Sequence, residues 1–506
     1  MNNVVNYLRK TATEYPDKLA FSDSSNSITF AELERRAGAL GNKIIAKTNG
    51  AFNKPIAVFM HKTVETIVAF FAVIMSGNYY SPIDVKMPQS RIKMICNVLK
   101  PVAVVTDELY EIDDAISIQY EDIQTKYDER AINNQLAKVL SVDPIYVLFT
   151  SGSTGIPKGV VISHAGVIDY VEWVIRTFEF NDTTVFGNQA PFFFDNSVLD
   201  IYTTIFTGAR MEIIDERMFT FPQELMDYMN QRNVNTVFWV PSALIGVANS
   251  GVLERSGNLP KLERILFAGE VMPAKQLRIW RKHFPDAMFV NLYGPTEITV
   301  DCTYYVVNRD YDDSESIPIG KACENTEILL LTEENKLADC GEIAEICVRG
   351  IGVSKGYYGN VEKTKDVFIQ NPLNSAYIDM IYKTGDLAKY DEKGNIIFIG
   401  RSDSQVKIQG HRIELGEIEV VASNIEGISR TCAVVSSEQK ICLILEVMVR
   451  VEPKSIYRAL KENLPRYMLP SSILQCYSMP LNENGKIDRQ LLRREVDEEN
   501  SGRFIS

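Results

Sequence analysis

The chain has 506 residues with 66 acidic and 53 basic side chains, and its net charge of −13 and pI near 5.1 argue against a nucleic-acid binder, whose footprint would be basic. Eight scattered cysteines without CxxC pairs and four histidines predict neither a disulfide scaffold nor a zinc site. Hydrophobic residues at 45% and charged residues at 24% are typical of a soluble globular protein, and the length favours roughly two to four domains.

The N-terminal part of the chain carries no targeting signal that we recognise. Residues 1–3 lead into a charged amphipathic segment rather than a signal peptide. The longest apolar run, residues 67–75, is shorter than the roughly 18 residues that a membrane helix needs, so we expect a buried helix there. These features predict a cytoplasmic protein with no membrane partner.

From about residue 55 to residue 294, short apolar runs alternate with helical patterns. Strands are predicted at 55–60, 102–106, 145–149, 236–240, 264–267 and 288–291, and a helix at 273–284. This alternation predicts an α/β fold with layers of mostly parallel sheets, in which ligands bind at the carboxyl ends of the strands.

A loop rich in glycine and hydroxyl side chains, FTSGSTGIPKG at 149–159, follows the strand predicted at 145–149. Its glycines allow the backbone to approach an anion closely, its hydroxyls add donors, and Lys158 adds a positive charge. It lacks the Gly-Lys-Ser/Thr end of the common P-loop. The sequence therefore predicts a polyphosphate-binding loop, with a flexible Gly/Ser linker as the alternative.

Two further motifs also follow predicted strands, at 268–270 (AGE) and 293–297 (YGPTE). After Gly341 the chain becomes strand-rich, with predicted strands at 342–348, 395–400 and 441–449. We expect a large domain at 1–402 and a small α+β domain at 403–506.

Several motifs together resemble one enzyme family. They are YSPID at 80–84, the loop at 149–159, NLYGPTE at 291–297, YKTGD at 382–386, GRSDSQVKIQGHRIE at 400–414 and NGKIDR at 484–489. In this order they resemble the adenylate-forming enzyme superfamily, and more narrowly the amino-acid adenylation domains of nonribosomal peptide synthetases and stand-alone D-alanine–carrier protein ligases. The resemblance covers nearly the whole chain and implies ATP and Mg²⁺ as cofactors.

The resemblance implies that a carboxylate attacks the α-phosphorus of ATP and that pyrophosphate departs. Two anions meet in this step, so their charge must be neutralised. By resemblance, Lys486 is the catalytic lysine, Glu297 is the Mg²⁺-associated acid and Asp403 is the hinge of a mobile small domain. The alternatives are a solvated charge for Lys486 and a charge at a helix N-terminus for Glu297.

The nucleotide site implied by the resemblance comes from both halves of the chain. Asp386 would bind the ribose with Arg401 nearby, Tyr293 would face the adenine, and Asn291 would reach its edge. Alternatively, Asp386 caps the turn after Gly385 and Tyr293 is a core residue. The full predicted set is Thr150, Ser151, Gly152, Ser153, Thr154, Lys158, Asn291, Tyr293, Gly294, Thr296, Asp386 and Arg401.

The segment FFFDNS at 192–197 resembles the family segment whose aspartate pairs with the α-ammonium of an amino acid. A carboxylate beside three phenylalanines is costly unless a cation meets it, so Asp195 favours an amino-acid substrate over a fatty or aryl acid. A surface turn residue is the alternative. The remaining predicted pocket residues are Asn196, Leu199, Phe238, Leu266, Ala268, Leu292, Val300 and Asp301.

Two pocket residues depart from the D-alanine ligase pattern. Those ligases commonly have a cysteine where Ala268 stands, and Asp301 adds an acid where an alanine pocket would suit a small or apolar residue. Both favour a polar or cationic substrate such as ornithine or lysine, unless Asp301 has a structural role.

We therefore predict a free-standing amino-acid ligase that loads a separate phosphopantetheinylated carrier protein, because the sequence ends at Ser506 without a carrier domain. A D-alanine–carrier protein ligase, an acyl- or aryl-CoA synthetase and a non-enzymatic binding relative are the alternatives. Retention of Lys158 and Lys486 argues against the last.

Overall fold

The computed structural model describes residues 3–108, 112, 115–120, 127–152, 155–257, 259–401, 405–481, 487–498 and 503–505. Its residues form two compact units. The large unit comprises Met1–Val85, Leu99–Leu148 and Gly159–Ser402, and the small unit comprises Lys86–Val98, Phe149–Lys158 and Asp403–Ser506. The small unit thus includes two segments that the sequence places in the large domain. Within the described part of the chain, no helix is long and apolar enough to span a bilayer.

One sheet of the described residues has six strands in the order β6-β5-β3-β4-β7-β8. The strands β3, β4, β5 and β6 pair in parallel, and β4 pairs in parallel with β7. All residues of β3 and β4 are buried, as expected for parallel strands that are covered on both faces of the sheet. For this reason parallel strands tend to appear in a sequence as nearly continuous apolar runs. The bounds are β3 (Pro55–Phe59), β4 (Tyr79–Ile83), β5 (Ala103–Thr106), β6 (Ile116–Gln119), β7 (Pro144–Thr150) and β8 (Lys158–Ser163).

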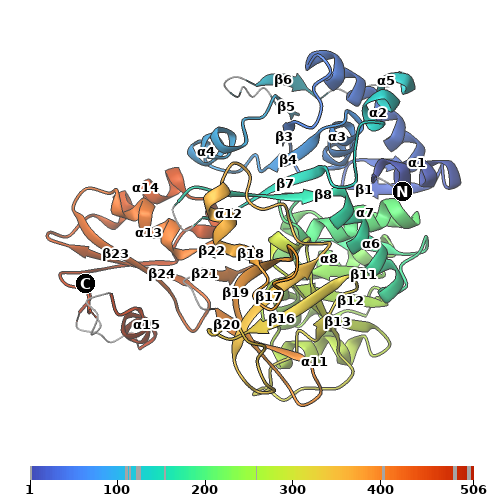
Figure 1. The fold of residues 1–506 in the computed structure, drawn as a ribbon. Coiled ribbons are helices and arrows are strands. Elements are labelled where there is room, and N and C mark those ends of the chain that lie inside the picture. Colours follow the sequence, from blue (N-terminus) through green and yellow to red (C-terminus); the bar gives the residue numbers. More distant parts are fainter. Residues whose placement is uncertain are drawn as a thin grey trace. The chain divides into compact units, whose positions relative to one another are not determined.

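A second sheet has nine described strands in the order β15-β14-β13-β12-β11-β9-β10-β1-β2. Its central strands are parallel, and β2, β14 and β15 are antiparallel additions at the edges. Figure 1 shows β11, β12 and β13 side by side, and the pairing of Ala268 with Leu292 aligns the ends of β12 and β13. The bounds are β1 (Leu19–Ser22), β2 (Ser27–Thr29), β9 (Val185–Asn188), β10 (Arg210–Ile213), β11 (Thr236–Trp239), β12 (Arg264–Ala268), β13 (Met288–Tyr293), β14 (Thr303–Val306) and β15 (Lys321–Ala322).

The helices of the large unit cover the apolar faces of its sheets. The apolar run predicted as a buried helix is α3, whose described residues are buried except Glu65. The bounds are α1 (Val5–Glu14), α2 (Phe30–Lys47), α3 (Val64–Met75), α5 (Glu129–Leu136), α6 (His164–Phe178), α7 (Asn196–Thr207), α8 (Pro222–Gln231), α9 (Pro241–Asn249), α10 (Val252–Arg255), α11 (Ala274–His283) and α12 (Val361–Val367), with 3-10 turns η1 (Glu216–Thr220) and η2 (Thr296–Ile298).

The strands from 344 to 401 pair with β16 (Thr326–Leu331), which precedes Gly341, in an antiparallel sheet of the large unit, whereas the strand predicted at 441–449 is β24 (Ile441–Val447) of the small unit. The other strands of this sheet are β17 (Ala344–Gly350), β18 (Phe368–Gln370), β19 (Met380–Tyr390) and β20 (Ile396–Arg401). Asp386 of β19 is directly opposite Arg401 of β20, so the strand register brings these two predicted nucleotide residues together.

The small unit is α+β. Its own core contains Ile413, Ile418, Leu443, Leu445 and Ile456. The bounds are α4 (Gln89–Leu99, whose last residue belongs to the large unit), β21 (Gln405–Ile408), β22 (His411–Glu414), α13 (Leu415–Ser423), β23 (Ile428–Val435), β24 (Ile441–Val447), α14 (Pro453–Asn463), η3 (Arg466–Met468), β25 (Ser472–Cys476) and α15 (Arg489–Asp497).

The predicted fold class is confirmed, and the strands lie within two residues of their predicted ends at most positions. The helix predicted at 273–284 is α11 (Ala274–His283). The motifs at 149–159, 268–270 and 293–297 lie at the ends of β7, β12 and β13.

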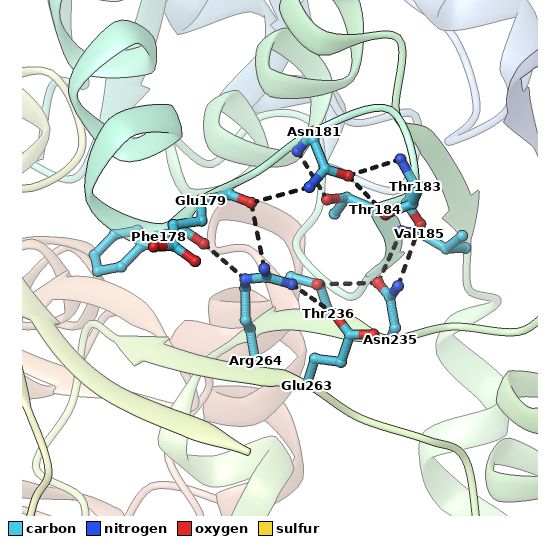
Figure 2. Close-up of polar contacts among 10 residues, drawn as sticks. All are labelled: Phe178, Glu179, Asn181, Thr183, Thr184, Val185, Asn235, Thr236, Glu263 and Arg264. Carbon is cyan, nitrogen blue, oxygen red and sulfur yellow. Dashed lines mark hydrogen bonds and ion pairs between the residues drawn. The ribbon is translucent and has the colours of Figure 1, made fainter. Parts of the chain in front are cut away.

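Arg264 at the start of β12 holds the end of α6 (Figure 2). Its Nε donates to the Phe178 carbonyl at 2.7 Å and its Nη2 to the Glu179 carbonyl at 3.2 Å. A cation at a helix C-terminus satisfies the last carbonyls and complements the helix dipole. Asn235 holds the start of the neighbouring strand β9. Its Oδ1 accepts from the Val185 amide, and its Nδ2 donates to the Thr183 carbonyl.

We predict that Arg264→Ala lowers the apparent Tm by several degrees, because each lost hydrogen bond from a charged donor is worth about 1.5–3 kcal/mol. Arg217→Ala removes an exposed arginine that pairs with Asp215 and serves as the control. Differential scanning calorimetry should show a decrease for the first variant and almost none for the second. Equal transitions would contradict the anchoring role of Arg264.

Candidate functional site

The loop after β7 is folded tightly on itself. A Cβ added at Gly152 would lie 2.0 Å from the Ile156 carbonyl oxygen, and Gly155 has a φ of +80°. Both positions therefore require glycine. The loop connects β7 and β8, and the Gly155 amide donates to the Gly152 carbonyl at 2.9 Å.

Within the small unit, carboxylates of β22 and α13 contact this loop. Lys158 Nζ lies 3.0 Å from Glu414 Oε1, and the Gly152 amide donates to Glu417 Oε2 at 3.2 Å. Burial raises the pKa of Glu417, and Arg91 pairs with the same carboxylate. Here the lysine and a backbone amide of the loop bind anionic oxygens, which is the chemistry that a phosphate requires.

The hydroxyls of the loop have different surroundings. Ser151 Oγ donates to the Arg412 carbonyl at 2.8 Å and accepts from the Glu414 amide at 3.0 Å. Thr150 Oγ1 is buried and has no hydrogen-bond partner among the described residues. Together with Lys158 and the Gly152 amide, this donor set fits ATP phosphates. The predicted residues Ser153, Thr154, Asp403 and Lys486 lie outside the described residues.

In the large unit, Asp386 is buried between two predicted nucleotide residues. Arg401 Nη1 donates to its Oδ1 at 2.5 Å, and the Tyr293 hydroxyl donates to its Oδ2. Burial and the charge of Asp386 raise the pKa of Tyr293. Asp386 lies inside β19 and Tyr293 at the end of β13, so the carboxylate joins two sheets rather than capping the turn at Gly385.

Asn291 and Glu297 occupy the region around the end of β13. The Asn291 amide nitrogen donates to the Pro318 carbonyl at 2.8 Å. Glu297, in η2, is fully buried, and the Tyr357 hydroxyl donates to its Oε1 at 2.8 Å. Among the described residues there is no group of three or more potential metal ligands. Mg²⁺ usually keeps several waters and needs only one or two protein carboxylates beside substrate phosphates, so Glu297 could hold it once its buried carboxylate becomes accessible.

A strained turn follows η2. Thr299 and Val300 have φ values of +60° and +70°, which are uncommon for β-branched residues. A Cβ added at Gly294 would lie 2.3 Å from the Val300 carbonyl oxygen and 2.5 Å from Asp301 Cα. Gly294 therefore lets this turn approach closely, and strain of this kind is often found at functional sites.

Asp195 precedes the first turn of α7 and is 9% exposed. Its side chain makes no capping hydrogen bond to the helix. The side-chain nitrogen of the adjacent Asn196 is buried and has no hydrogen-bond partner in the described part of the chain. Asp195 is therefore not an exposed turn residue, and the helix N-terminus favours its negative charge.

The apolar residues of the predicted pocket all lie in the hydrophobic core of the large unit. Each is at most 3% exposed, and they belong to the same core cluster of the large unit: Leu199, Phe238, Leu266, Ala268, Leu292 and Val300.

Asp301 is buried beside an unpredicted residue, Tyr170 of α6. The Tyr170 hydroxyl donates to Asp301 Oδ2 at 2.7 Å. The sequence also missed Tyr357, Glu414 and Glu417. The two tyrosines carry no signal in the sequence, since each resembles a core aromatic. Glu414 ends the motif that contains HRIE and could have been noted as a partner of Lys158, whereas Glu417 lies three residues beyond that motif.

The comparisons with known proteins agree with these motifs. The model of the AMP-binding enzyme family matches residues 8–358. The chain belongs to the AMP-binding enzyme family. This AMP-binding enzyme is 33% identical to a D-alanine–D-alanyl carrier protein ligase of Bacillus licheniformis, covering 97% of this chain and 99% of the relative.

Two larger relatives match over only part of their length. This AMP-binding enzyme is 30% identical to surfactin synthase subunit 3 of Bacillus subtilis, with 96% of the chain and 38% of the relative covered. It is 34% identical to bacitracin synthase 1 of Bacillus licheniformis, with 95% of the chain and 9% of the relative covered.

Solved structures support the same fold. The nonribosomal peptide synthetase protein PA1221, with adenylation and PCP domains, has a TM-score of 0.83 at 23% identity over 98% of this chain and 84% of that chain. IdnL1 has a TM-score of 0.81 at 22% identity over 95% of this chain and 99% of that chain. At this identity the likeness concerns the fold.

We predict that Gly152→Ala weakens ATP binding by at least about tenfold, because the added methyl group must displace the loop backbone, and a loss of about 1.4 kcal/mol is already tenfold. Gly246→Ala is the control, since a Cβ there meets nothing within 4 Å. Isothermal titration calorimetry with ATP should separate the two variants. Unchanged affinity in Gly152→Ala would show that the loop does not hold the nucleotide.

Proposed function

We propose that this AMP-binding enzyme is an amino-acid–carrier protein ligase. It would adenylate an amino acid with ATP and then transfer the aminoacyl group to the phosphopantetheine thiol of a carrier protein. The observation that carries the proposal is Asp195, which is 9% exposed, precedes the first turn of α7 and stands in the segment FFFDNS that resembles the family's amino-acid-binding segment. A carboxylate at this position can accept charge-assisted hydrogen bonds from the α-ammonium group of an amino acid.

Within the small unit, Lys158, Thr150 and the Gly152 amide suit the phosphates of ATP. Within the large unit, Asp386 suits the vicinal ribose hydroxyls, because a carboxylate accepts several hydrogen bonds. Arg401 and Tyr293 fix the orientation of Asp386. Mg²⁺ near Glu297 would supply neutralisation of phosphate charge.

The carrier protein is proposed from the relatives. The Bacillus licheniformis relative that this chain covers almost completely is named a D-alanine–D-alanyl carrier protein ligase, and the PA1221 structure joins adenylation and PCP domains. We also propose Asp403 as the hinge about which residues 403–506 move between adenylation and transfer.

D-alanine is the second candidate substrate, favoured by the name of that relative. Ala268 and Asp301 instead favour a substrate whose side chain is more polar than that of alanine. Asp301 is buried and accepts from Tyr170, and a pocket for alanine would not need a buried acid at its wall.

We predict that Lys486→Ala largely abolishes adenylate formation while ATP affinity changes little. The lysine would act on charge that develops at the reacting centre, whereas the nucleotide is held by other residues. Pyrophosphate exchange and equilibrium ATP binding measure the two effects, with Lys461→Ala on α14 as a control for loss of a small-unit lysine. Near-normal exchange in Lys486→Ala would contradict its catalytic role.

We predict that Asp195→Asn, which keeps the side-chain shape, lowers kcat/KM for the amino acid by roughly 10²–10⁴, because breaking a buried ion pair costs about 3–5 kcal/mol. ATP binding should persist. Asp310→Asn removes the charge of an exposed acid and is the control. If Asp195→Asn activates amino acids normally, the proposed function is wrong.

A further inference from the structure

The contact between Tyr170 and Asp301 bears on substrate choice and rests on the proposed function. Tyr170 lies in the middle of α6, is buried, and packs against Trp173 with ring centroids 5.8 Å apart. Trp173 in turn packs against Tyr304 of β14 at 5.4 Å. This packing leaves the phenol ring little freedom, so its hydroxyl is a fixed donor.

The backbone that carries Asp301 is fixed as well. The left-handed turn at Thr299 and Val300 packs on Gly294, and the Asp301 amide donates to the Thr299 carbonyl at 3.1 Å. The amide of Cys302 then donates to the Tyr293 carbonyl at 2.8 Å. Rotation of the Asp301 side chain is the main freedom that remains, and the hydrogen bond from Tyr170 limits it.

Tyr170 also lies within electrostatic range of Asp195. Burial, the charge of Asp301 and, more weakly, the charge of Asp195 raise the pKa of Tyr170, so its hydroxyl stays protonated and acts as a donor. In the proposed site, an amino acid whose ammonium group meets Asp195 would extend its side chain toward Asp301.

We propose that Tyr170 is a specificity-determining positioning residue. By holding the Asp301 carboxylate in place, it selects amino acids whose side chain carries a hydrogen-bond donor, an ammonium or a hydroxyl group, over those that end in a methyl group. A carboxylate can accept about four hydrogen bonds, and the phenol supplies one. A methyl group would offer the buried acid no hydrogen-bond donor, which is how a polar site rejects an apolar substrate.

The test compares KM and kcat for pyrophosphate exchange with alanine, serine, ornithine and lysine in both chiral forms. The unaltered enzyme should prefer a donor-bearing substrate. Tyr170→Phe should raise KM for that substrate at least tenfold, with kcat within twofold and the KM for alanine unchanged. In the Asp301→Ala background, Tyr170→Phe should have no further effect, because the tyrosine acts through the acid.

The control is Tyr228→Phe, which removes an equivalent phenol–carboxylate hydrogen bond, from Tyr228 to the buried Glu212 at 3.1 Å, elsewhere in the large unit. It should leave all four substrates unchanged. If Tyr170→Phe folds poorly, as its Tm will show, Asp301→Asn must give the same selective rise in KM, since it keeps the shape and removes the charge.

Three results would overturn the inference: a preference of the unaltered enzyme for alanine, an equal rise in KM for alanine and donor-bearing substrates in Tyr170→Phe, or additive effects of Tyr170→Phe and Asp301→Ala. These results differ from failure of the proposed function, in which Asp195→Asn would activate every amino acid normally.

Discussion

A buried carboxylate must be hydrogen bonded or paired, and this constraint organises the candidate site. Asp195, Glu297, Asp301 and Asp386 are all buried in the large unit. Three of them accept hydrogen bonds from residues elsewhere in the chain, Glu297 from Tyr357, Asp301 from Tyr170 and Asp386 from Arg401. Because an uncompensated buried charge costs several kcal/mol, these partners stabilise the fold.

Strand register positions two of these acids, Glu297 and Asp386. The ends of β12 and β13 are aligned by their register, and the loops that follow them carry Gly269 and Glu297 beyond the same edge. The antiparallel pairing of β19 with β20 then places Asp386 against Arg401. The backbone hydrogen bonds between the paired strands therefore fix the positions from which these side chains extend.

Much of this was predictable from sequence, because strands, glycine turns and ordered motifs are local patterns. Gly152 and Gly294 illustrate it: both stand in motifs, and both are positions where a Cβ would collide with the backbone. Contacts between distant residues were not predictable. Tyr170 lies 131 residues from Asp301, and Tyr357 lies 60 residues from Glu297. In the sequence, both tyrosines follow the hydrophobic pattern of buried core residues. No local feature distinguishes a tyrosine hydroxyl that contacts a carboxylate from one that is surrounded only by apolar side chains.

The most direct test is amino-acid-dependent exchange of labelled pyrophosphate into ATP by the unaltered enzyme. Each D- and L-amino acid would be compared with the acid of the same shape that lacks the α-amino group. The structure predicts rapid exchange with at least one amino acid and almost none with its counterpart, because Asp195 would meet no ammonium group. Equal exchange with both would contradict amino-acid activation and favour an acyl-CoA synthetase.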